Sequence, residues 1–323
     1  MPFAHFVDRL RGLPRVIVQA HNFPDHDAVA SAFALGYLLQ TQGIPVQLVY
    51  DGIIDRISLH NLIQWLNIPL HHVSETVLDT RDKIILVDGC TGEKNVTDIT
   101  GEEIAVIDHH RVTPRGPLWF CDVRPDHGAT VTLIYDYYRR MGIEIPAVVA
   151  TAMQVGLAID TANLTRGFCQ KDIEAFSYLH SRADAAMVNR LTRNSVQVHE
   201  LAFYRRLLQG YTIHERVAYA WIEGGCPKNM LGVLGDFMLS IDEVDATVLA
   251  APTDDFIQLS LRSEHASIDV ARLVTQVLTS RQLGFGGGHQ HMAGGVIPHA
   301  KWPSEGSPEL LFGWFKESLG HYR

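Results

Sequence analysis

Four groups of polar residues in the first half of the chain carry side chains of the types that can bind divalent metal ions. Each group follows an apolar run or ends one. They are His21-Asn22-Phe23-Pro24-Asp25-His26-Asp27, Asp88-Gly89, Asp108-His109-His110 and Asp160-Thr161. Carboxylates that converge without a cation repel one another, and burying an unpaired carboxylate is costly. Oxygen and imidazole ligands without thiolate suit Mn²⁺, and less strictly Mg²⁺, Fe²⁺ or Co²⁺. The sequence therefore predicts a divalent-metal site, with manganese as the leading ion.

Each group taken alone also has an ordinary structural explanation. An aspartate that follows a strand, such as Asp88, is often a turn or helix-cap residue. A single histidine such as His21 is more often packed or on the surface, and Asp160 has the alternative role of ending its helix. The adjacent pair His71-His72 receives no role. Four groups on successive elements are hard to obtain from capping alone, and this favours the metal site.

A metal site of this kind requires a fold that brings the ends of several strands together. Apolar runs alternate with helical stretches in the first half, which is typical of a mostly parallel sheet with helices on both faces. In such sheets, ligands bind beyond the carboxyl ends of the strands. The expected strands are 16–18, 46–50, 84–87, 104–107 and 118–120, and the expected helices are 27–40, 58–66, 130–141 and 147–159.

The second half of the chain predicts a separate, smaller α/β domain. The stretch 171–208 contains no glycine or proline and reads as continuously helical, and Gly210 ends it. Strand-like runs follow at 217–222, 247–251 and 256–261, with a helical stretch near 230–240. We therefore predict a metal-binding domain over 1–186, a connecting helix over 187–210 and a smaller α/β domain over 211–323.

The composition narrows the classes of partner. The formal charge of −9 argues against a protein that coats long duplex DNA through a wide basic face. A short phosphorylated substrate stays compatible with that charge, because a few cations and arginines reverse the field in one cleft. The four cysteines form no C-x-x-C pair, which favours reduced thiols. The first residues do not read as a signal peptide, and no run of about 18 apolar residues occurs. We therefore expect a cytoplasmic protein without a membrane partner; a homodimer stays open.

The order of the four groups resembles the DHH phosphoesterase family over nearly the whole N-terminal half. That family includes RecJ-like exonucleases, nanoRNases, cyclic-dinucleotide phosphodiesterases and, more distantly, family II inorganic pyrophosphatases. Its first motif, His-x-x-x-Asp-x-Asp-Ala followed by Ser, resembles the run of His21, Asp25, Asp27, Ala28 and Ser31. Its later motifs resemble Asp88, Asp108-His109-His110 and Asp160-Thr161.

The resemblance implies two metal ions that share one carboxylate. One ion would take His21, Asp25 and Asp88, and the other would take Asp27, Asp88, His109 and Asp160. Such a pair, about 3.5–4 Å apart, stabilises the charge that develops during attack on a phosphate. His110 would then face the phosphate as a donor or proton carrier, while Asp108 would orient its neighbours. Arg111 is a weaker candidate for phosphate contact, since a solvated arginine explains it equally well.

The second half resembles the DHH-associated substrate-binding domain in two places. These are Arg262-Ser263 and a later glycine-rich loop, Leu283-Gly284-Phe285-Gly286-Gly287-Gly288-His289. Consecutive glycines let backbone N–H groups approach a phosphate closely. Arg262 offers bidentate contact with phosphate or stacking on a base, and His289 offers a further donor. The family usually places alanine where this chain has Met292, a bulkier residue that would narrow the cleft and alter substrate preference.

These features favour a hydrolase that cleaves phosphodiester bonds in short oligonucleotides. A nanoRNase-like oligoribonuclease or exonuclease acting on di- to tetranucleotides leads, with removal of phosphate from phosphoadenosine phosphate as an added activity. A cyclic-dinucleotide phosphodiesterase is the main alternative. Inorganic pyrophosphatase is more distant, because the Ser-Arg-Lys-Lys pattern that its C-terminal half resembles is not found here. A nucleotide sensor without catalysis is disfavoured because all six expected ligands are present.

Overall fold

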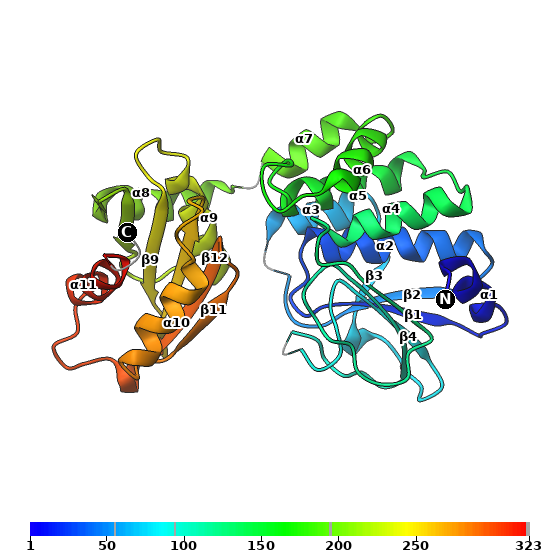
Figure 1. The fold of residues 1–323 in the computed structure, drawn as a ribbon, viewed down its shortest axis with the longest axis horizontal. Helices are drawn as coiled ribbons and strands as arrows, with labels where there is room; N and C mark the ends of the chain where they lie inside the picture. The colour runs from blue at the N-terminus through cyan, green and yellow to red at the C-terminus, as the bar shows by residue number, and fades with distance from the viewer. Residues whose placement is uncertain (55, 94, 194–195, 321–323) are drawn as a thin grey trace. The chain divides into compact units, whose positions relative to one another are not determined.

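The computed structural model describes residues 1–320 except 55, 94, 194 and 195. The chain divides into two compact units, Met1–Ser195 and Val196–Arg323. Each unit has its own sheet and its own buried core, as Figure 1 shows. Among the described residues, no helix combines the length and the apolar character needed to cross a bilayer.

The sheet of the first unit is wholly parallel along all five of its strand pairings. Its strand order is β3-β2-β1-β4-β5-β6. The strands are β1 (Val16–Ala20), β2 (Val46–Tyr50), β3 (Leu70–His72), β4 (Lys83–Val87), β5 (Glu102–Asp108) and β6 (Phe120–Val123). Because every strand runs the same way, their carboxyl ends meet along one edge, so residues that follow β1, β4 and β5 are brought together there.

The helices of the first unit gather on one face of this sheet, as Figure 1 shows for α2, α4 and α5. Apolar residues of the helices form one core with Val18, Val87 and Ile107 of the strands. The helices are α1 (Phe3–Leu10), α2 (His26–Thr41), α3 (Ile57–Trp65), α4 (Thr130–Met141), α5 (Ala147–Asp160), α6 (Gln170–His180) and α7 (Ala185–Arg193). The parallel α/β class is confirmed, but the expected helices on the second face are not found among the described residues.

Irregular chain covers that second face. Ile17, Leu86 and Val106 point toward it and pack with Leu78, Val96, Val112 and Leu118, which lie in segments between strands. In their described residues, the connections from β4 to β5 and from β5 to β6 therefore cover the sheet without a helix. They still bury the apolar residues of the strands, so the sequence shows the same uninterrupted apolar runs that two helical layers would produce.

Helix α2 lies between the sheet and helices α4 and α5, and nearly all of its residues are buried. Gly156 of α5 allows the two helices to approach closely. A Cβ at this position would lie 3.1 Å from the Ala30 Cβ and 3.1 Å from the carbonyl oxygen of His26. This close approach brings Asp160, at the end of α5, to the start of α2 where Asp27 lies.

The second unit is a six-stranded sheet with helices on both faces, in the order β11-β12-β10-β9-β8-β7. Strands β8 and β9 are parallel, and the other pairs are antiparallel. The strands are β7 (Tyr211–His214), β8 (Val217–Trp221), β9 (Ala246–Pro252), β10 (Phe256–Ser263), β11 (Phe285–Gly288) and β12 (Met292–Pro298). Helices α8 (Leu201–Gly210) and α9 (Lys228–Leu239) pack on one face, and α10 (Val270–Ser280) and α11 (Pro308–Leu319) on the other.

The stretch expected to be one continuous helix from 171 to 208 is divided into shorter elements. Helices α6, α7 and α8 are separated by turns, and a 3-10 turn covers Val198–Glu200. The Asp184 carboxylate accepts a hydrogen bond from the Met187 backbone N–H at 3.0 Å, so it starts a new helix. The connecting helix expected over 187–210 thus corresponds to the end of α7, that turn and α8, while residues 194 and 195 lie outside the described residues.

Two smaller expectations also need correction. The strand expected over 118–120 begins at Phe120 and continues as β6, because Leu118 packs instead in the irregular layer. The glycine run expected as a loop is the edge strand β11, which pairs antiparallel with β12. Other boundaries agree closely, since the helix expected over 130–141 is α4.

Candidate metal centre

The six expected metal ligands converge at the carboxyl edge of the parallel sheet. Each is positioned by the end of a regular element: the ends of β1, β4 and β5, the start of α2, and the last residue of α5. The six are His21, Asp25, Asp27, Asp88, His109 and Asp160. They fall into two groups of three, each with possible ligand atoms within 4.8 Å of one another, and Asp88 lies beside both.

The first group consists of His21, Asp25 and Asp88. The His21 Nε2 lies 3.6 Å from the Asp88 Oδ2. On the other side of the ring, Nδ1 lies 2.8 Å from the carbonyl oxygen of Asn22, so Nδ1 carries the proton and donates. The Nε2 lone pair therefore faces the carboxylates, which is the orientation that a metal-binding imidazole takes.

The second group consists of Asp27, His109 and Asp160. The His109 Nε2 lies 3.3 Å from Asp160 Oδ2 and 3.9 Å from Asp27 Oδ2. Its Nδ1 donates to the carbonyl oxygen of His127 at 3.1 Å, which directs Nε2 toward the carboxylates. This buried Nε2 has no hydrogen-bond partner among the described residues. A metal ion between this nitrogen and the carboxylate oxygens would satisfy both, so these residues fit a metal ion.

Asp88 lies between the two groups and faces both. Its Oδ2 is the atom near His21, and its Oδ1 lies 3.6 Å from the His109 Nε2. The Thr130 hydroxyl donates to Oδ1 at 2.8 Å and fixes the carboxylate. The backbone of Asp88 has a φ of 57°, a left-handed conformation that aspartate tolerates better than most residues. One oxygen of this single carboxylate therefore faces each of the two ligand groups.

The negative charges of the clustered carboxylates repel one another, and this repulsion shifts their pKa values. Burial, followed by repulsion from Asp88, raises the pKa of Asp27 to about 7. Burial and the charge of Asp25 raise the pKa of Asp88 to about 6, and the same causes raise the pKa of Asp160 well above its usual value. Asp25 itself differs: burial opposes ionisation, but His21 and backbone N–H groups hold its pKa below the usual value. A divalent cation favours the ionised form of all four carboxylates.

These pKa directions predict how metal affinity depends on pH. Asp27 and Asp88 must lose protons to act as ligands, and their raised pKa values place that loss near pH 6 to 7. We expect Mn²⁺ to bind more tightly as pH rises from about 5 to about 8, with proton release during binding. Calorimetry in two buffers of different ionisation enthalpy measures both quantities; an affinity that is flat over this range would contradict the ligand assignment.

His110 and Asp108 form a pair beside the cluster. The Asp108 carboxylate is buried, and its Oδ1 accepts hydrogen bonds from the His110 backbone N–H and Nδ1, each at 2.9 Å. Burial opposes the charged imidazole, but the hydrogen bond to Asp108 prevails and raises the pKa of His110 to about 9. The His110 side chain is 38% exposed. A protonated, half-exposed imidazole beside the cluster has the chemistry of a proton donor.

Two further residues that position the cluster were not identified from the sequence. Thr130, at the start of α4, donates from its backbone N–H to Asp27 Oδ2 at 2.6 Å, although the two residues are 103 positions apart. Val131 donates to the other oxygen at 3.0 Å. The start of a helix thus anchors Asp27, and it favours the charged carboxylate through its dipole. No local motif marks this contact, because it depends on the packing of α4 against α2.

Arg262 in the second unit is held firmly in place. Its Nε donates to the Asp236 carboxylate at 3.1 Å, Nη1 donates to the carbonyl oxygen of Leu261 at 3.0 Å, and the side chain is 13% exposed. A Cβ on Gly232 of α9 would lie 2.6 Å from the Arg262 Nη2. The guanidinium therefore lies against a glycine of α9, and its orientation is set before any ligand arrives.

Ser263 and Arg111 were both expected to contact substrate, but Ser263 is buried and Arg111 is exposed. Ser263 is buried, and its hydroxyl donates to the carbonyl oxygen of Asp245 at 3.2 Å while accepting from the His265 N–H at 3.1 Å. Its hydroxyl thus stabilises the turn after β10, and we leave Ser263 out of the substrate contacts proposed below. Arg111 is exposed, next to His110.

The glycine run lies on the edge strand β11, where Gly286, Gly287 and Gly288 pair with β12. Packing requires glycine at position 288, because a Cβ on Gly288 would lie 2.3 Å from the carbonyl oxygen of Met292. His289 and Met292 close the hairpin through backbone hydrogen bonds of 2.7 and 3.2 Å. Met292 is paired with Arg262 across β12 and β10, so the residue that departs from the family pattern is a direct neighbour of the guanidinium.

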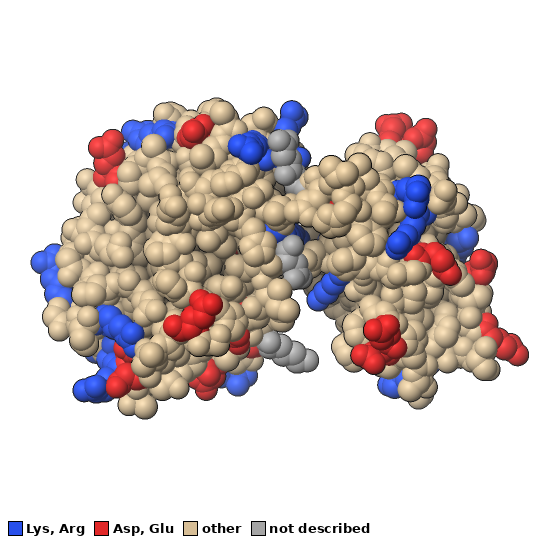
Figure 2. All heavy atoms as spheres, turned by 180° about the vertical axis from the view of Figure 1, so that it is seen from behind, with Lys and Arg blue, Asp and Glu red and all other residues tan. Residues whose placement is uncertain are grey.

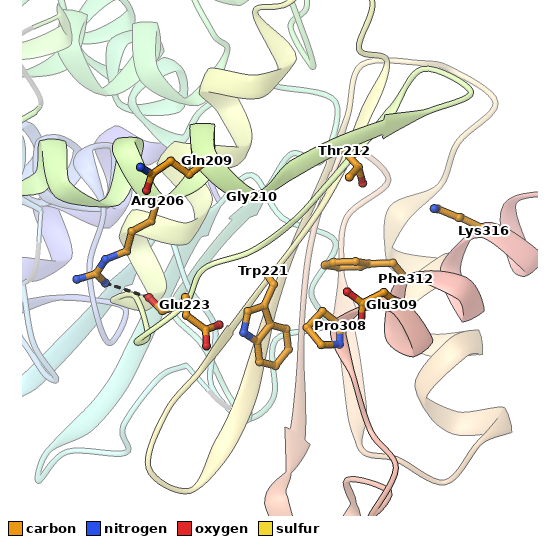
Figure 3. Close-up of a pocket in the computed structure, with 10 residues that line it drawn as sticks. All are labelled: Arg206, Gln209, Gly210, Thr212, Trp221, Glu223, Pro308, Glu309, Phe312 and Lys316. Carbon is orange, nitrogen blue, oxygen red and sulfur yellow. Dashed lines mark hydrogen bonds between the residues drawn. The ribbon is translucent and has the colours of Figure 1, made fainter.

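A pocket of about 480 Å³ lies elsewhere in the second unit and contains none of the expected substrate residues. Figure 3 shows Trp221, Pro308 and Phe312 around it, with the basic residues Arg206 and Lys316 at its sides. On the face drawn in Figure 2, basic and acidic side chains are interspersed, and its described residues form no continuous basic stripe.

The fold and the site together define a two-unit α/β protein with a candidate two-metal centre at the edge of its parallel sheet. Residues 15–157 match the DHH family, N-terminal domain, and residues 214–310 match the DHHA1 domain. The chain therefore belongs to the DHH family, as the order of its motifs predicted.

Two known proteins are similar to this chain in sequence. An uncharacterized protein of Methanocaldococcus jannaschii is 26% identical over 94% of this chain and 62% of its own length. A probable manganese-dependent inorganic pyrophosphatase of Enterococcus faecalis is 29% identical over 55% of this chain and 57% of its own length. The chain thus spans less than two thirds of each of these relatives.

Solved structures match over nearly the whole chain. An exopolyphosphatase-related protein from Bacteroides fragilis has a TM-score of 0.80 at 19% identity, covering 99% of this chain and 95% of that one. RecJ from Thermus thermophilus in complex with Mn²⁺ has a TM-score of 0.54 at 18% identity, covering 99% of this chain and 53% of RecJ. At these identities the likeness concerns the fold.

Proposed function

We propose that this protein is a two-metal phosphodiesterase that hydrolyses short oligonucleotides of two to four nucleotides. The observation that carries the proposal is the pair of ligand groups on either side of Asp88, whose two oxygens face different imidazoles. Manganese is the proposed ion, because the ligands are carboxylate and imidazole and because the similar pyrophosphatase is named as manganese-dependent.

His21, Asp25 and Asp88 would hold one ion, and Asp27, Asp88, His109 and Asp160 would hold the other. Two such ions supply Lewis-acid stabilisation of the phosphoryl charge and activate water. The chain's own contribution is to fix the ligands: Asn22 and His127 orient the imidazoles, and Thr130 orients Asp88.

His110 is the proposed general acid. Asp108 holds its Nδ1 and keeps the imidazole protonated at neutral pH, so that the ring can donate a proton to a phosphate oxygen or to the leaving group. The buried Asp108 carboxylate stays ionised, because its pKa lies below the usual value; burial opposes this, but the hydrogen bonds from His110 prevail. Asp108 thus acts through His110.

The proposed substrate-binding residues lie in the second unit. Arg262, preorganised against α9, would bind a phosphate or a base at a distance from the reacting bond, and the exposed Gly287 and His289 would offer further donors. A few such groups suffice for a short substrate in a chain whose formal charge is −9. Phosphoadenosine phosphate and linear or cyclic dinucleotides present the same chemistry and are included in the test.

Replacing Arg262 with alanine is expected to raise KM for a dinucleotide by about tenfold to a hundredfold with little change in kcat, because the lost contact is made equally in the ground and transition states. Steady-state kinetics with wild type and Arg262→Ala measures this split. Arg216→Ala, which removes an exposed arginine paired with Asp245, is the matched control. A fall in kcat at constant KM would instead assign Arg262 to transition-state stabilisation.

Inorganic pyrophosphatase is the second candidate, favoured by the similarity to enzymes of that name. The DHHA1 domain and the Arg262 environment favour a nucleotide instead. A mass-spectrometric screen with Mn²⁺ against dinucleotides, cyclic dinucleotides, phosphoadenosine phosphate and pyrophosphate separates the candidates. We expect the fastest turnover on linear dinucleotides; turnover of pyrophosphate alone would contradict the proposal. Asp88→Asn protein purified in parallel excludes a contaminating hydrolase.

A further inference from the structure

Phe23 is an exposed aromatic residue in a strained backbone conformation within the metal-binding turn. The residue is 62% exposed, and its φ is 53°. A bulky residue rarely adopts the left-handed region, and the following Pro24 additionally favours an extended conformation. Both the exposure and the strain disfavour phenylalanine on grounds of stability, and such outliers cluster at functional sites.

The surrounding contacts hold this ring in one place. The Phe23 backbone N–H donates to the carbonyl oxygen of Asp51 at 3.0 Å. A Cβ on Gly52 would lie 3.0 and 3.1 Å from the ring atoms Cδ1 and Cε1 of Phe23, so the ring lies directly against this glycine. Gly52 has a φ of 79°, a conformation that glycine adopts at no steric cost. The neighbouring Ile53 is 65% exposed and adds a second apolar side chain on the surface.

A hydrogen-bond network fixes the turn from the other side. Asn22 donates to the Thr97 hydroxyl at 2.8 Å and accepts from the Thr97 N–H at 3.1 Å. The Thr97 hydroxyl in turn donates to the Asp51 carboxylate, which lies 3.3 Å from the His72 Nε2. The backbone that carries the Phe23 ring is therefore fixed, because Asn22 is tied to Thr97 and the Phe23 N–H is tied to Asp51, which directly follows β2.

The position of Phe23 relates this apolar surface to the phosphate chemistry. Phe23 lies two positions from His21 and two positions from Asp25, so its Cα lies within about 7 Å of the Cα of each proposed ligand. The turn follows β1, and Gly52 lies just after β2, at the same edge of the sheet. Phe23 therefore lies at the same sheet edge as the candidate metal centre, close enough along the chain for a planar group attached to a bound phosphate to reach it.

We propose that Phe23 is a stacking platform for a nucleobase of the substrate. The proposal rests on the phosphodiesterase function above and extends it, because it assigns base recognition to the first unit as well. A nucleobase is the planar apolar group that a phosphate ester brings to such a site, whereas pyrophosphate has no part that would use an exposed aromatic ring. Stacking of one base on an aromatic side chain contributes about 1–3 kcal/mol.

The test compares binding of adenosine monophosphate with binding of ribose phosphate, which lacks the base, by calorimetry in the presence of Mn²⁺. The wild type is expected to bind adenosine monophosphate about 5- to 150-fold more tightly than ribose phosphate. Phe23→Ala and Phe23→Leu should bring this ratio toward one, and Phe23→Trp should retain most of it. Leucine keeps the apolar bulk but offers no flat face, so it carries the test if the alanine variant does not fold.

Val77→Ala is the matched control, because Val77 is 86% exposed and lies at the opposite edge of the sheet, where Arg15 just before β1 contacts its carbonyl oxygen. A ratio that persists in Phe23→Leu, or a wild type that binds both ligands equally, would overturn the proposal. Turnover of a dinucleotide by the wild type is measured separately. Its absence would refute the proposed phosphodiesterase function, while the binding ratio would still decide the role of Phe23.

Discussion

Replacing Asp88 with asparagine is expected to reduce turnover of a dinucleotide roughly a thousandfold or more. Several kcal/mol of charge stabilisation come from the metal ions, and each 1.36 kcal/mol corresponds to a factor of ten in rate. Asparagine fits the backbone, because it tolerates the left-handed conformation that Asp88 adopts with a φ of 57°. Bound Mn²⁺ should fall from two ions per chain to one or none.

The same substitution should leave the metal-free protein folded. Burial and repulsion raise the pKa of Asp88, so a neutral amide removes an unfavourable buried charge rather than a stabilising one. Thermal unfolding of metal-free wild type and Asp88→Asn checks this point. Asp8→Asn, which changes an exposed aspartate paired with Arg11, is the matched control for turnover and metal content. An Asp88→Asn enzyme with normal turnover and two bound ions would refute the bridging role.

His110→Asn is expected to lower kcat by about a hundredfold to ten-thousandfold, the range for losing a general acid. The asparagine amide can still donate to Asp108, as the His110 Nδ1 does, so the local structure and Mn²⁺ binding should be retained. The pKa of about 9 for His110 also predicts that wild-type kcat falls as pH rises through that value. The variant should lack this alkaline decline.

His71→Asn provides the comparison for His110→Asn, because His71 is exposed and has no expected role. Its kcat and pH profile should equal those of the wild type. A His110→Asn enzyme with wild-type kcat and two bound Mn²⁺ ions would show that no proton passes through this imidazole.

The convergence of the proposed metal ligands could be predicted from the sequence because the fold is parallel. In a parallel sheet, residues that directly follow separate strands share one edge, so His21, Asp88 and His109 needed no knowledge of side-chain packing. The start of α2 follows β1 within a few residues, which places Asp25 and Asp27 as well.

Contacts that depend on how the helices pack could not be predicted from the sequence. Thr130 binds Asp27 and Asp88 because α4 packs against α2, and the close approach of α5 depends on Gly156, a single glycine in an apolar helix. Likewise, an apolar strand residue such as Ile17 looks the same in sequence whether a helix or irregular chain covers it. The glycine run at 286–288 has the composition of a loop, and only its pairing with β12 makes it a strand.

The central claim is that six side chains hold two divalent ions with Asp88 between them. Anomalous diffraction from crystals of the full chain grown with Mn²⁺ tests it directly. The account predicts two peaks about 3.5–4 Å apart, one beside His21 and Asp25 and the other beside His109 and Asp160, each within ligand distance of Asp88. A single peak, or peaks that do not touch Asp88, would contradict it.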